Sequence, residues 1–358
     1  MHDIVEVLGS WYGEGIPFAL ARVITTFPAS PRPPGSALAV NARGAVVGDV
    51  SGDTATEAIR VIAEQVLATG RTALRELVVA DRAASAAGLT CGGTLRAFIE
   101  PVDPQHWPEF TGVLAAMRER RPLAVATVLD TGVEVARHLL IEAERTTGTL
   151  GSPELDRSVA KQGREHLLRG TTALSSAGSD ATEVFLQSLV PAPRLLIFGA
   201  VDLAREVAAL GDFLGYRVSV CDARPGFATT QRFPQAVEVV ERMPHEFFSA
   251  TSLDERTAVC VFTHDLSYDV PLLRAALRTS VPYIGVMGSR HTHAERVAAL
   301  RDAGVSAQQL SRLRAPIGLD LGGRSPRETA LSILGEVLAA RTGSSGRPLV
   351  ELTEAIHR

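Results

Sequence analysis

Residues 194–222 read RLLIFGAVDLAREVAALGDFLGYRVSVCD, and this stretch sets the architecture expected for the C-terminal half of the chain. The apolar strand RLLIF is followed by a turn at Gly199 and then by a helix that Gly215 ends. Four apolar residues at helical spacing are expected to form the buried stripe of this helix: Leu203, Val207, Leu210 and Leu214. A second strand, RVSVC, ends at Asp222. This order is typical of a Rossmann βαβ unit, in which an acid at the tip of the second strand binds a ribose hydroxyl.

The glycine pattern of that turn is only partly present. Gly199 can make the tight turn, and Ala204 is small enough for the helix to pack against the strand. Val201 stands where a middle glycine would let a pyrophosphate approach the backbone. Asp202 adds negative charge at a helix start that would otherwise attract an anion, and we interpret it as the helix N-cap. We therefore predict that NAD(P) does not bind tightly.

Polar residues follow two further strands of this half. AVCVFTHD places His264 and Asp265 at a carboxyl end, and PYIGVMGSRHTH places Gly288, Ser289 and Arg290 between a strand and a helix. In a doubly wound parallel sheet the carboxyl ends of the strands line one crevice. We expect these segments to border it.

A glycine-rich loop precedes the last helix. Ser325 and Glu328 form a capping box, and Pro326 takes the first helical position. The buried face of this helix is predicted to consist of Ala330, Ile333, Leu334, Val337 and Leu338. Capping does not explain the other polar and glycine residues of the loop, which are Arg314, Asp320, Gly322, Gly323 and Arg324.

The N-terminal half repeats itself. PFALARVITT (17–26) resembles PLAVATVLDT (122–131), and residues 48–74 align with residues 148–174 without a gap. Each copy reads as strand, turn, strand and helix, with Thr54 as a plausible cap of the first helix. The prolines of VPAPR (190–194) mark a boundary, so we predict an N-terminal α/β domain with an internal duplication over 1–189 and a C-terminal Rossmann-like domain, a doubly wound parallel sheet, over 190–358.

Composition narrows the class of protein. The chain has 358 residues and a net charge of -4, which gives no general attraction to nucleic acid or anionic membranes. The start, MHDIVEV, lacks the basic residues of a secretory signal, and no apolar run is long enough to span a membrane. We expect a cytoplasmic protein whose three cysteines, Cys91, Cys221 and Cys260, are reduced thiols.

Cys91 differs from the other two cysteines. It lies in GLTCGG (88–93), directly before a predicted strand, and Gly92 and Gly93 leave space around it. The sulfur is either an approachable ligand or a small buried residue at a strand start. Cys221 and Cys260 lie inside apolar strands, and we expect them to be buried.

The stretches PRPPGSALAV, GLTCGGTLRAFIEP, CDARPGFATTQRFPQA, FTHDLSYDVPLL, YIGVMGSR and RAPIGLDLGGR resemble the XdhC/CoxI family of xanthine dehydrogenase accessory proteins, over almost the whole chain. The resemblance implies a maturation factor without turnover of its own. Such a factor binds molybdenum cofactor, holds it while its terminal sulfur is installed, and delivers it to an apo-enzyme of the molybdenum hydroxylase class. A cysteine desulfurase partner and a homodimer go with this interpretation as expectations.

Under this resemblance the cofactor site is assigned to Cys91, Gly92, Gly93, Gly199, Asp222, Arg224, Gly288, Ser289, Arg290, Asp320, Gly322, Gly323 and Arg324. Thiolate suits a soft metal centre, so Cys91 is the predicted contact to the cofactor's molybdenum, and glycine-rich helix starts with arginine suit its phosphate. His291 and His293 diverge by roughly 200° on a helix, so they are not predicted to share a metal ion.

Two departures from the family pattern leave alternatives open. The family's first glycine turn carries a cysteine near the position of Thr54, and its Rossmann turn carries glycine at the position of Val201. One alternative is an NAD(P)-dependent oxidoreductase that uses the Rossmann half. The other is a non-catalytic module that binds another nucleotide or anion.

Overall fold

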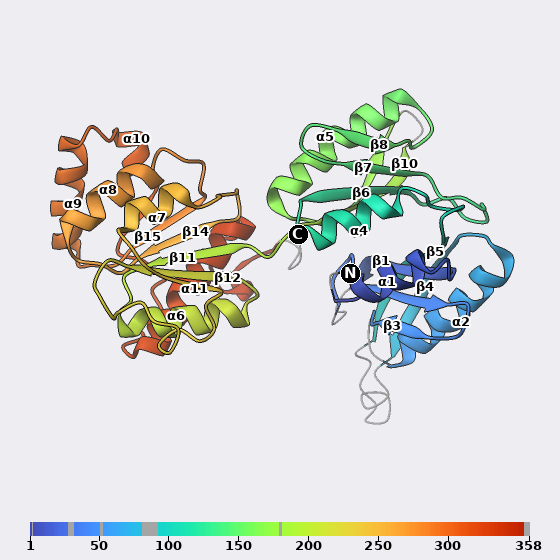
Figure 1. The fold of residues 1–358 in the computed structure, drawn as a ribbon, viewed down its shortest axis with the longest axis horizontal. Coiled ribbons are helices and arrows are strands. Elements are labelled where there is room, and N and C mark those ends of the chain that lie inside the picture. Colours follow the sequence, from blue (N-terminus) through green and yellow to red (C-terminus); the bar gives the residue numbers. More distant parts are fainter. Residues whose placement is uncertain (2, 28–31, 51–52, 81–91, 179–180, 354–358) are drawn as a thin grey trace. The chain divides into compact units, whose positions relative to one another are not determined.

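The computed structural model divides the chain into two compact units, Met1–Pro191 and Ala192–Arg358, which are described separately (Figure 1). The structure describes residues 1, 3–27, 32–50, 53–80, 92–178 and 181–353. Within these ranges no helix is both long and apolar enough to cross a bilayer.

The first unit consists of two copies of one topology. The elements of the first copy are α1 (Val5–Gly13), β1 (Phe18–Phe27), β2 (Ala37–Asn41), β3 (Val46–Gly48), α2 (Asp53–Thr69), β4 (Ala73–Ala80) and β5 (Gly92–Val102). Those of the second are α4 (Phe110–Arg118), β6 (Leu123–Val128), β7 (His138–Ile141), β8 (Thr146–Gly148), α5 (Pro153–Arg169), β9 (Ala173–Ala177) and β10 (Thr182–Leu189). The antiparallel sheets have the orders β3-β2-β1-β5-β4 and β8-β7-β6-β10-β9. The predicted internal repeat is therefore confirmed.

Equivalent residues adopt equivalent conformations in the two copies. Gly48 and Gly148, which end β3 and β8, have φ of +90° and +91°. A Cβ at either position would collide with a backbone carbonyl oxygen of the neighbouring strand, from Ala37 or His138. Both helices begin five residues after these glycines. The predicted cap of the first helix is wrong, because α2 begins at Asp53 and Thr54 lies inside it.

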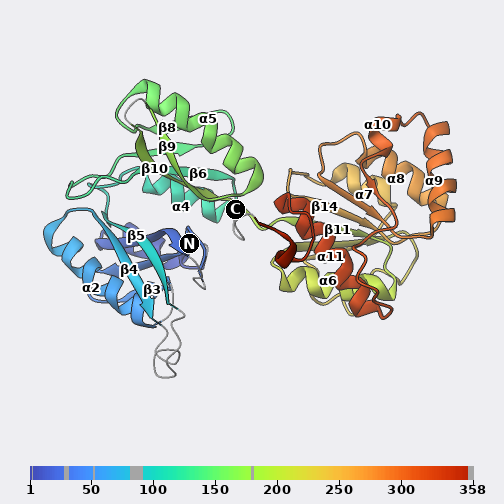
Figure 2. The same cartoon turned by 180° about the vertical axis from the view of Figure 1, so that it is seen from behind.

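Each sheet is covered on one face by its own long helix (Figure 2). Ile59 and Val66 of α2 pack against the first sheet, and Leu155, Val159 and Leu167 of α5 pack against the second. The opposite faces contribute to a core shared by both sheets and by α1 and α4. The first unit is thus a pair of sheets that share one core between them.

A polar network lies between the two sheets. Arg22 Nη2 donates to Glu100 Oε1 at 2.5 Å and to Thr127 Oγ1 at 2.9 Å, and His138 Nε2 lies 2.9 Å from Glu100 Oε2. The ring of Trp107 stacks on His138, with centroids 3.7 Å apart. All five residues are buried. Buried charges of this kind are tolerated only when they are paired, so the network ties one copy to the other.

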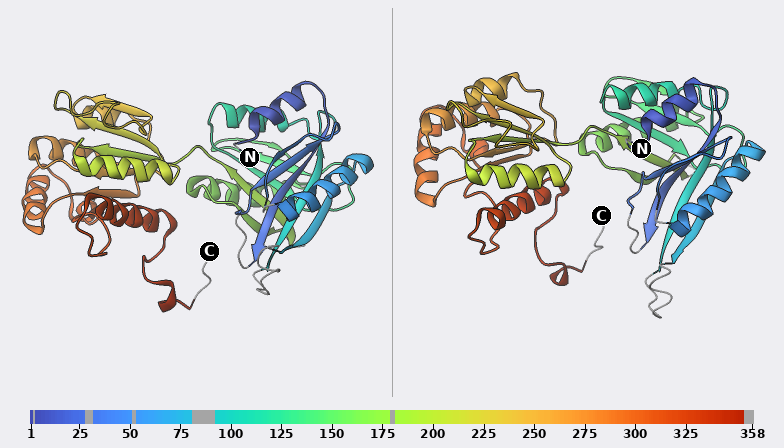
Figure 3. Two further views of the ribbon diagram at one scale, coloured as in Figure 1. Left: turned by 90° about the horizontal axis from the view of Figure 1, so that it is seen from below. Right: turned by 60° about the horizontal axis from the view of Figure 1, so that its bottom comes forward.

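The second unit is a parallel six-stranded sheet of order β13-β12-β11-β14-β15-β16. Its elements are β11 (Arg194–Phe198), α6 (Asp202–Phe213), β12 (Arg217–Asp222), β13 (Glu238–Glu241), α7 (Pro244–Ala250), β14 (Ala258–Val261), α8 (Leu266–Ala276), β15 (Tyr283–Val286), α9 (Arg290–Asp302), α10 (Ala307–Leu310), β16 (Leu313–Arg314) and α11 (Pro326–Thr342). Helices α6 and α11 cover one face, and α7, α8 and α9 cover the other (Figure 3). This is the strand order of a Rossmann fold, so the predicted fold class is confirmed.

Two predicted core positions of this unit are wrong. Leu214 follows the last helical residue of α6 and is 40% exposed, because the chain already turns there toward Gly215 with φ of +79°. Leu338 of α11 is also 40% exposed, because it lies at the edge of the helix face that buries Ile333, Leu334 and Val337. The predicted capping box of Ser325 and Glu328 is present.

Candidate functional site

The residues assigned to a site fall in both units. Cys91 lies outside the described residues, and Gly92 and Gly93 open β5 opposite Ala80 and Val79 of β4. The other assigned residues belong to the second unit, where they lie at or just after the ends of strands of the parallel sheet or precede α11.

The turn at Gly199 lies at the topological switch point of the sheet, where β11 has β12 on one side and β14 on the other. Gly199 has φ of +99°, and a Cβ there would lie 2.9 Å from the backbone nitrogen of Thr263 and 3.0 Å from the carbonyl carbon of Phe262. Any side chain would therefore push the turn away from the end of β14. Glycine is required here for close packing of two backbones.

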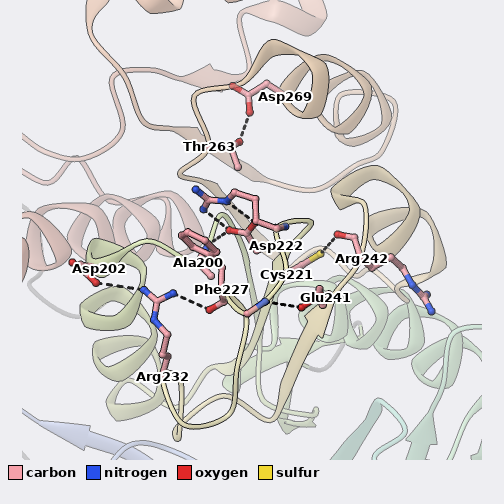
Figure 4. Close-up of polar contacts among 12 residues, drawn as sticks. Ala200, Asp202, Cys221, Asp222, Phe227, Arg232, Glu241, Arg242, Thr263 and Asp269 are labelled. Carbon is pink, nitrogen blue, oxygen red and sulfur yellow. Dashed lines mark hydrogen bonds and ion pairs between the residues drawn. The ribbon is translucent and has the colours of Figure 1, made fainter.

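Asp222 is where the sequence predicts it, at the tip of β12, but its carboxylate is already occupied (Figure 4). Oδ2 accepts from Ala200 N at 2.7 Å and from Arg224 Nη2 at 2.6 Å. Oδ1 accepts from Arg224 N at 2.9 Å and from Arg224 Nε at 3.0 Å. Burial alone would raise the pKa of Asp222, but these hydrogen bonds outweigh it and hold the pKa below its ordinary value. A carboxylate with about four lone-pair sites has none left for a ribose diol.

The start of α6 also differs from a dinucleotide site. Val201, not Asp202, is the N-cap, with φ of -85° and ψ of 171°, so the N-cap interpretation of Asp202 is wrong. Asp202 is the first helical residue, and its exposed carboxylate pairs with Arg232 at 3.4 Å (Figure 4). Val201 itself packs partly against the core.

We expect no binding of NAD+ or NADP+ tighter than about 100 μM, a level worth roughly 5.5 kcal/mol. The reasons are the occupied carboxylate of Asp222 and the side chain of Val201. Calorimetric titration checks the expectation, and Val201→Gly should improve any residual binding because it removes the obstruction at the turn. A dissociation constant of a few micromolar for the unmodified protein would contradict this view of the site.

Arg224 has an aromatic neighbour that sequence reasoning missed. Its guanidinium lies 3.9 Å from the ring centroid of Phe227, and that of Arg232 lies 5.6 Å from the same ring. Both side chains are partly exposed in the segment between β12 and β13. The available signal is the pair of arginines flanking GF in RPGFATTQR. The ring of Phe227 is thus flanked by two arginines, and each of them is also paired with an acid, Asp222 or Asp202.

The turn after β15 carries the second group of assigned residues. Gly288 has φ of +146°, and Ser289 caps α9 by accepting from Thr292 N at 3.1 Å. Arg290 is the first helical residue and is exposed.

The neighbouring histidines lie in different surroundings. His291 is exposed and lies 3.5 Å from Glu295, whereas His293 is half-buried. Across the described part of the chain, no group of three or more His, Cys, Asp or Glu side chains could hold a metal ion.

The third group precedes α11. The backbone nitrogens of Arg324 and Ser325 both donate to Glu328 Oε2 at 2.9 Å, and a Cβ at Gly323 would lie 2.6 Å from Glu328 Cβ. The loop is therefore folded onto the first turn of its own helix. Asp320 and the side chain of Arg324 are exposed.

A buried cluster that sequence reasoning missed lies between the turn at Gly199 and the turn after β15. Thr263, which abuts Gly199, donates to Asp269 Oδ1, and Asp269 Oδ2 accepts from Arg296 Nε at 2.9 Å. Burial raises the pKa of Asp269, although Thr263 and Arg296 oppose the rise. Arg296 in turn lies beneath the turn of Gly288. In the sequence, Asp269 shares the buried face of α8 with apolar Leu272 and Leu273. In α9 only Leu300 is buried besides Arg296, so that helix gives no comparable signal.

Cys221 and Cys260 are fully buried, as predicted. Burial raises the pKa of Cys221 to about 12, and burial also raises that of Cys260. Neither thiol is available as a thiolate to a ligand in the crevice.

Comparison with known families finds matches in both units. A model described as the XdhC Rossmann domain matches residues 195–337, and one described as the XdhC and CoxI family matches residues 11–78.

Similar curated proteins include the uncharacterized protein YqeB of Escherichia coli, 27% identical over 66% of this chain and 47% of the relative. A Bacillus subtilis protein named as a probable subunit of xanthine dehydrogenase is 30% identical over 45% of this chain and 46% of the relative. The molybdenum cofactor insertion chaperone PaoD of Escherichia coli is 31% identical over 42% of this chain and 41% of the relative. The chain thus spans about half the length of the curated relatives it matches.

A crystal structure described as a xanthine dehydrogenase from Bacillus halodurans has the same fold. Its TM-score is 0.66 at 22% identity, and the match covers 97% of this chain and 98% of that one.

Proposed function

Because the chain belongs to the XdhC and CoxI family, we propose that it is a maturation factor that binds molybdenum cofactor and delivers it to a xanthine dehydrogenase-type molybdenum hydroxylase. The name of PaoD, a molybdenum cofactor insertion chaperone, and that of the Bacillus subtilis relative support the proposal. A cysteine desulfurase partner and a homodimer stay predictions.

The second unit offers groups that suit the phosphate of the cofactor. Arg290 is an exposed cation at the start of α9, and Arg324 precedes α11. Arg224, at the end of β12, shares its charge with Asp222. Glycine at 199 and 288 keeps the backbone of two turns free of side chains at the carboxyl edge. Arginine beside helix starts is a frequent arrangement for binding phosphate. These residues fit an anionic group.

The soft end of the cofactor needs a different donor. A thiolate suits molybdenum and its dithiolene sulfurs, and two of the three cysteines are buried thiols with raised pKa values. Cys91 is therefore the residue that we propose as the contact to the metal centre. When bound, the cofactor would supply the redox-active metal to the client enzyme, and this chain would hold and release it.

The observation that carries the proposal is the match of family models to both units, combined with a Rossmann turn whose Asp222 is saturated by Ala200 and Arg224. The same contacts weigh against the NAD(P)-dependent oxidoreductase, which needs that carboxylate for a ribose. No observation favours the third alternative, a module for another nucleotide or anion, over the cofactor.

Differential thiol labelling tests the assignment of the donor. A maleimide should modify Cys91 in the native protein, whereas Cys221 and Cys260 should react only after unfolding because they are buried. Added molybdenum cofactor should slow the modification of Cys91. Mass spectrometry of the digested protein identifies the labelled site. A Cys91 that resists the reagent, or whose labelling the cofactor leaves unchanged, would show that this sulfur is structural.

A further inference from the structure

An aromatic ring stacked on a guanidinium is open to solvent in the segment that follows β12. The guanidinium carbon of Arg224 lies 3.9 Å from the ring centroid of Phe227. The side chain of Arg224 is 40% exposed, and Phe227 is 38% exposed. A single exposed apolar residue is ordinary on a protein surface, so exposure alone does not indicate a site.

The backbone that carries Phe227 is fixed by side chains from two other places. Gly226 N donates to Glu241 Oε2 at 2.9 Å, at the end of β13. Arg232 Nη1 donates to the carbonyl oxygen of Phe227 at 2.9 Å (Figure 4). Gly226 has φ of +75°, a conformation that favours glycine. The ring is therefore positioned before any ligand arrives, which lowers the entropic cost of binding to it.

The guanidinium of Arg224 is fixed as well, and its charge is paired. Nε and Nη2 donate to the two carboxylate oxygens of Asp222. These N–H bonds lie in the guanidinium plane, so the acid engages the edge and leaves the faces for stacking. Arg232 is paired with Asp202 in a similar way. A flat surface whose charges are already paired suits a planar ring better than a phosphate.

The stacked pair borders the crevice at the topological switch point, where β12 and β14 lie on either side of β11. Two strands separated by a third are about 9.6 Å apart, and one planar ring needs ~7 Å between the groups that contact its faces. The segments on the two sides of this gap, 225–227 and 264–267, are exposed. The pKa of Arg224 is raised by its hydrogen bonds to Asp222 and, to a smaller extent, by Tyr268 of α8, so this phenol lies near the guanidinium.

We propose that Arg224 and Phe227 form a stacking platform for the planar ring of the ligand, and that this ring is a pterin. The pterin lies against the exposed face of the Arg224 guanidinium, whose other face is supported by Phe227. Flat heterocycles are commonly bound on arginine and aromatic faces in this way. The inference rests on the proposed function for the choice of a pterin over other planar heterocycles.

Free pterin is the probe, because it carries the ring without a phosphate or a metal. Its fluorescence anisotropy is followed as the full chain is added. We expect saturable binding that Phe227→Leu weakens roughly fivefold or more, since leucine keeps an apolar side chain but removes the flat ring. Phe227→Tyr should bind pterin as the unmodified chain does.

Phe213→Leu is the matched control. Phe213 ends α6 in the same unit and is 83% exposed, so the same substitution there should leave pterin binding unchanged. Arg224→Lys keeps a positive charge for Asp222 but removes the planar group, and it should weaken binding by a factor similar to that of Phe227→Leu. Pterin that shows no saturable binding, or that binds Phe227→Leu and Arg224→Lys as well as the unmodified chain, would overturn the platform.

The outcomes for the platform and for the proposed function are separable. A chain that carries molybdenum cofactor, and whose Phe227→Leu variant carries as much and binds pterin equally well, would overturn only the platform. A chain that binds pterin through Arg224 and Phe227 but never carries cofactor would overturn only the function.

Discussion

Glu100→Gln is expected to lower the free energy of unfolding of the first unit by about 3–5 kcal/mol, the usual cost of removing one partner of a buried ion pair. Glu100 accepts from Arg22 and lies 2.9 Å from His138 Nε2, and all three side chains are buried. Glutamine has nearly the same size, so the packing around position 100 is kept while the charge is lost. The loss leaves the guanidinium of Arg22 buried without a counter-charge.

Position 100 also has an internal counterpart. The strand registers pair Leu20 with Glu100 and Val125 with Gln187, so Gln187 is the equivalent residue in the second copy. Glutamine is thus already accommodated at this place in the fold. The side-chain nitrogen of Gln187 donates a neutral hydrogen bond to the carbonyl oxygen of Gly35 at 2.8 Å. The expected destabilisation therefore comes from charge and not from shape.

Glu183→Gln is the matched control. Glu183 pairs with Arg96 at 3.0 Å between β10 and β5, but both side chains are partly exposed. Loss of this pair should cost about 0.2–1 kcal/mol. Both tryptophans, Trp11 and Trp107, lie in the first unit, so urea unfolding followed by tryptophan fluorescence reports on that unit. Equal effects of the two substitutions would show that the buried network contributes no more than a surface pair.

The pH dependence provides an independent check on Glu100. Burial raises its pKa, but His138 and Arg22 outweigh burial and hold the pKa below the ordinary value of 4.5. A lowered folded-state pKa stabilises the protein above about pH 4.5, and this contribution is lost as the pH falls through the folded-state pKa. The difference in stability between the unmodified chain and Glu100→Gln should therefore shrink in acid.

Much of the architecture is predictable from the sequence because it depends on local patterns. Strand, glycine turn, helix and acid in residues 194–222 indicate a Rossmann unit, and the structure has that strand order. The ungapped match of residues 48–74 with 148–174 indicates the repeat, and α2 and α5 occupy equivalent positions within it. Each of these patterns can be recognised within one short segment of the chain.

The buried polar clusters are not predictable in this way. Arg22 and Thr127 are far apart in sequence and meet only because two sheets pack face to face. Asp269 and Arg296 resemble ordinary surface charges until the register of α8 against α9 is known. The position of Asp222 at a strand tip follows from the sequence, but its saturation depends on the path of Arg224 after the strand. Contacts between residues that the fold brings together decide which partners these side chains have.

The central claim is that the chain binds molybdenum cofactor through Cys91. The most direct test compares the cofactor content of the purified unmodified chain with that of Cys91→Ser. The chain is produced in a molybdenum-replete host, and its molybdenum is measured by metal analysis and its pterin by fluorescence. We expect both in the unmodified chain. We expect the molybdenum and pterin content of Cys91→Ser to be lower by a factor of roughly ten or more. Even residues that only support a metal ligand typically contribute 10–100-fold to metal affinity. No cysteine stands near Thr54 to replace the lost sulfur.

Cys221→Ser is the control for this measurement, since Cys221 is buried and its thiol donates to the carbonyl oxygen of Arg242. Per mole of folded protein, it should carry as much molybdenum and pterin as the unmodified chain. An unmodified chain free of both, or a Cys91→Ser variant that carries them at the unmodified level, would contradict the account.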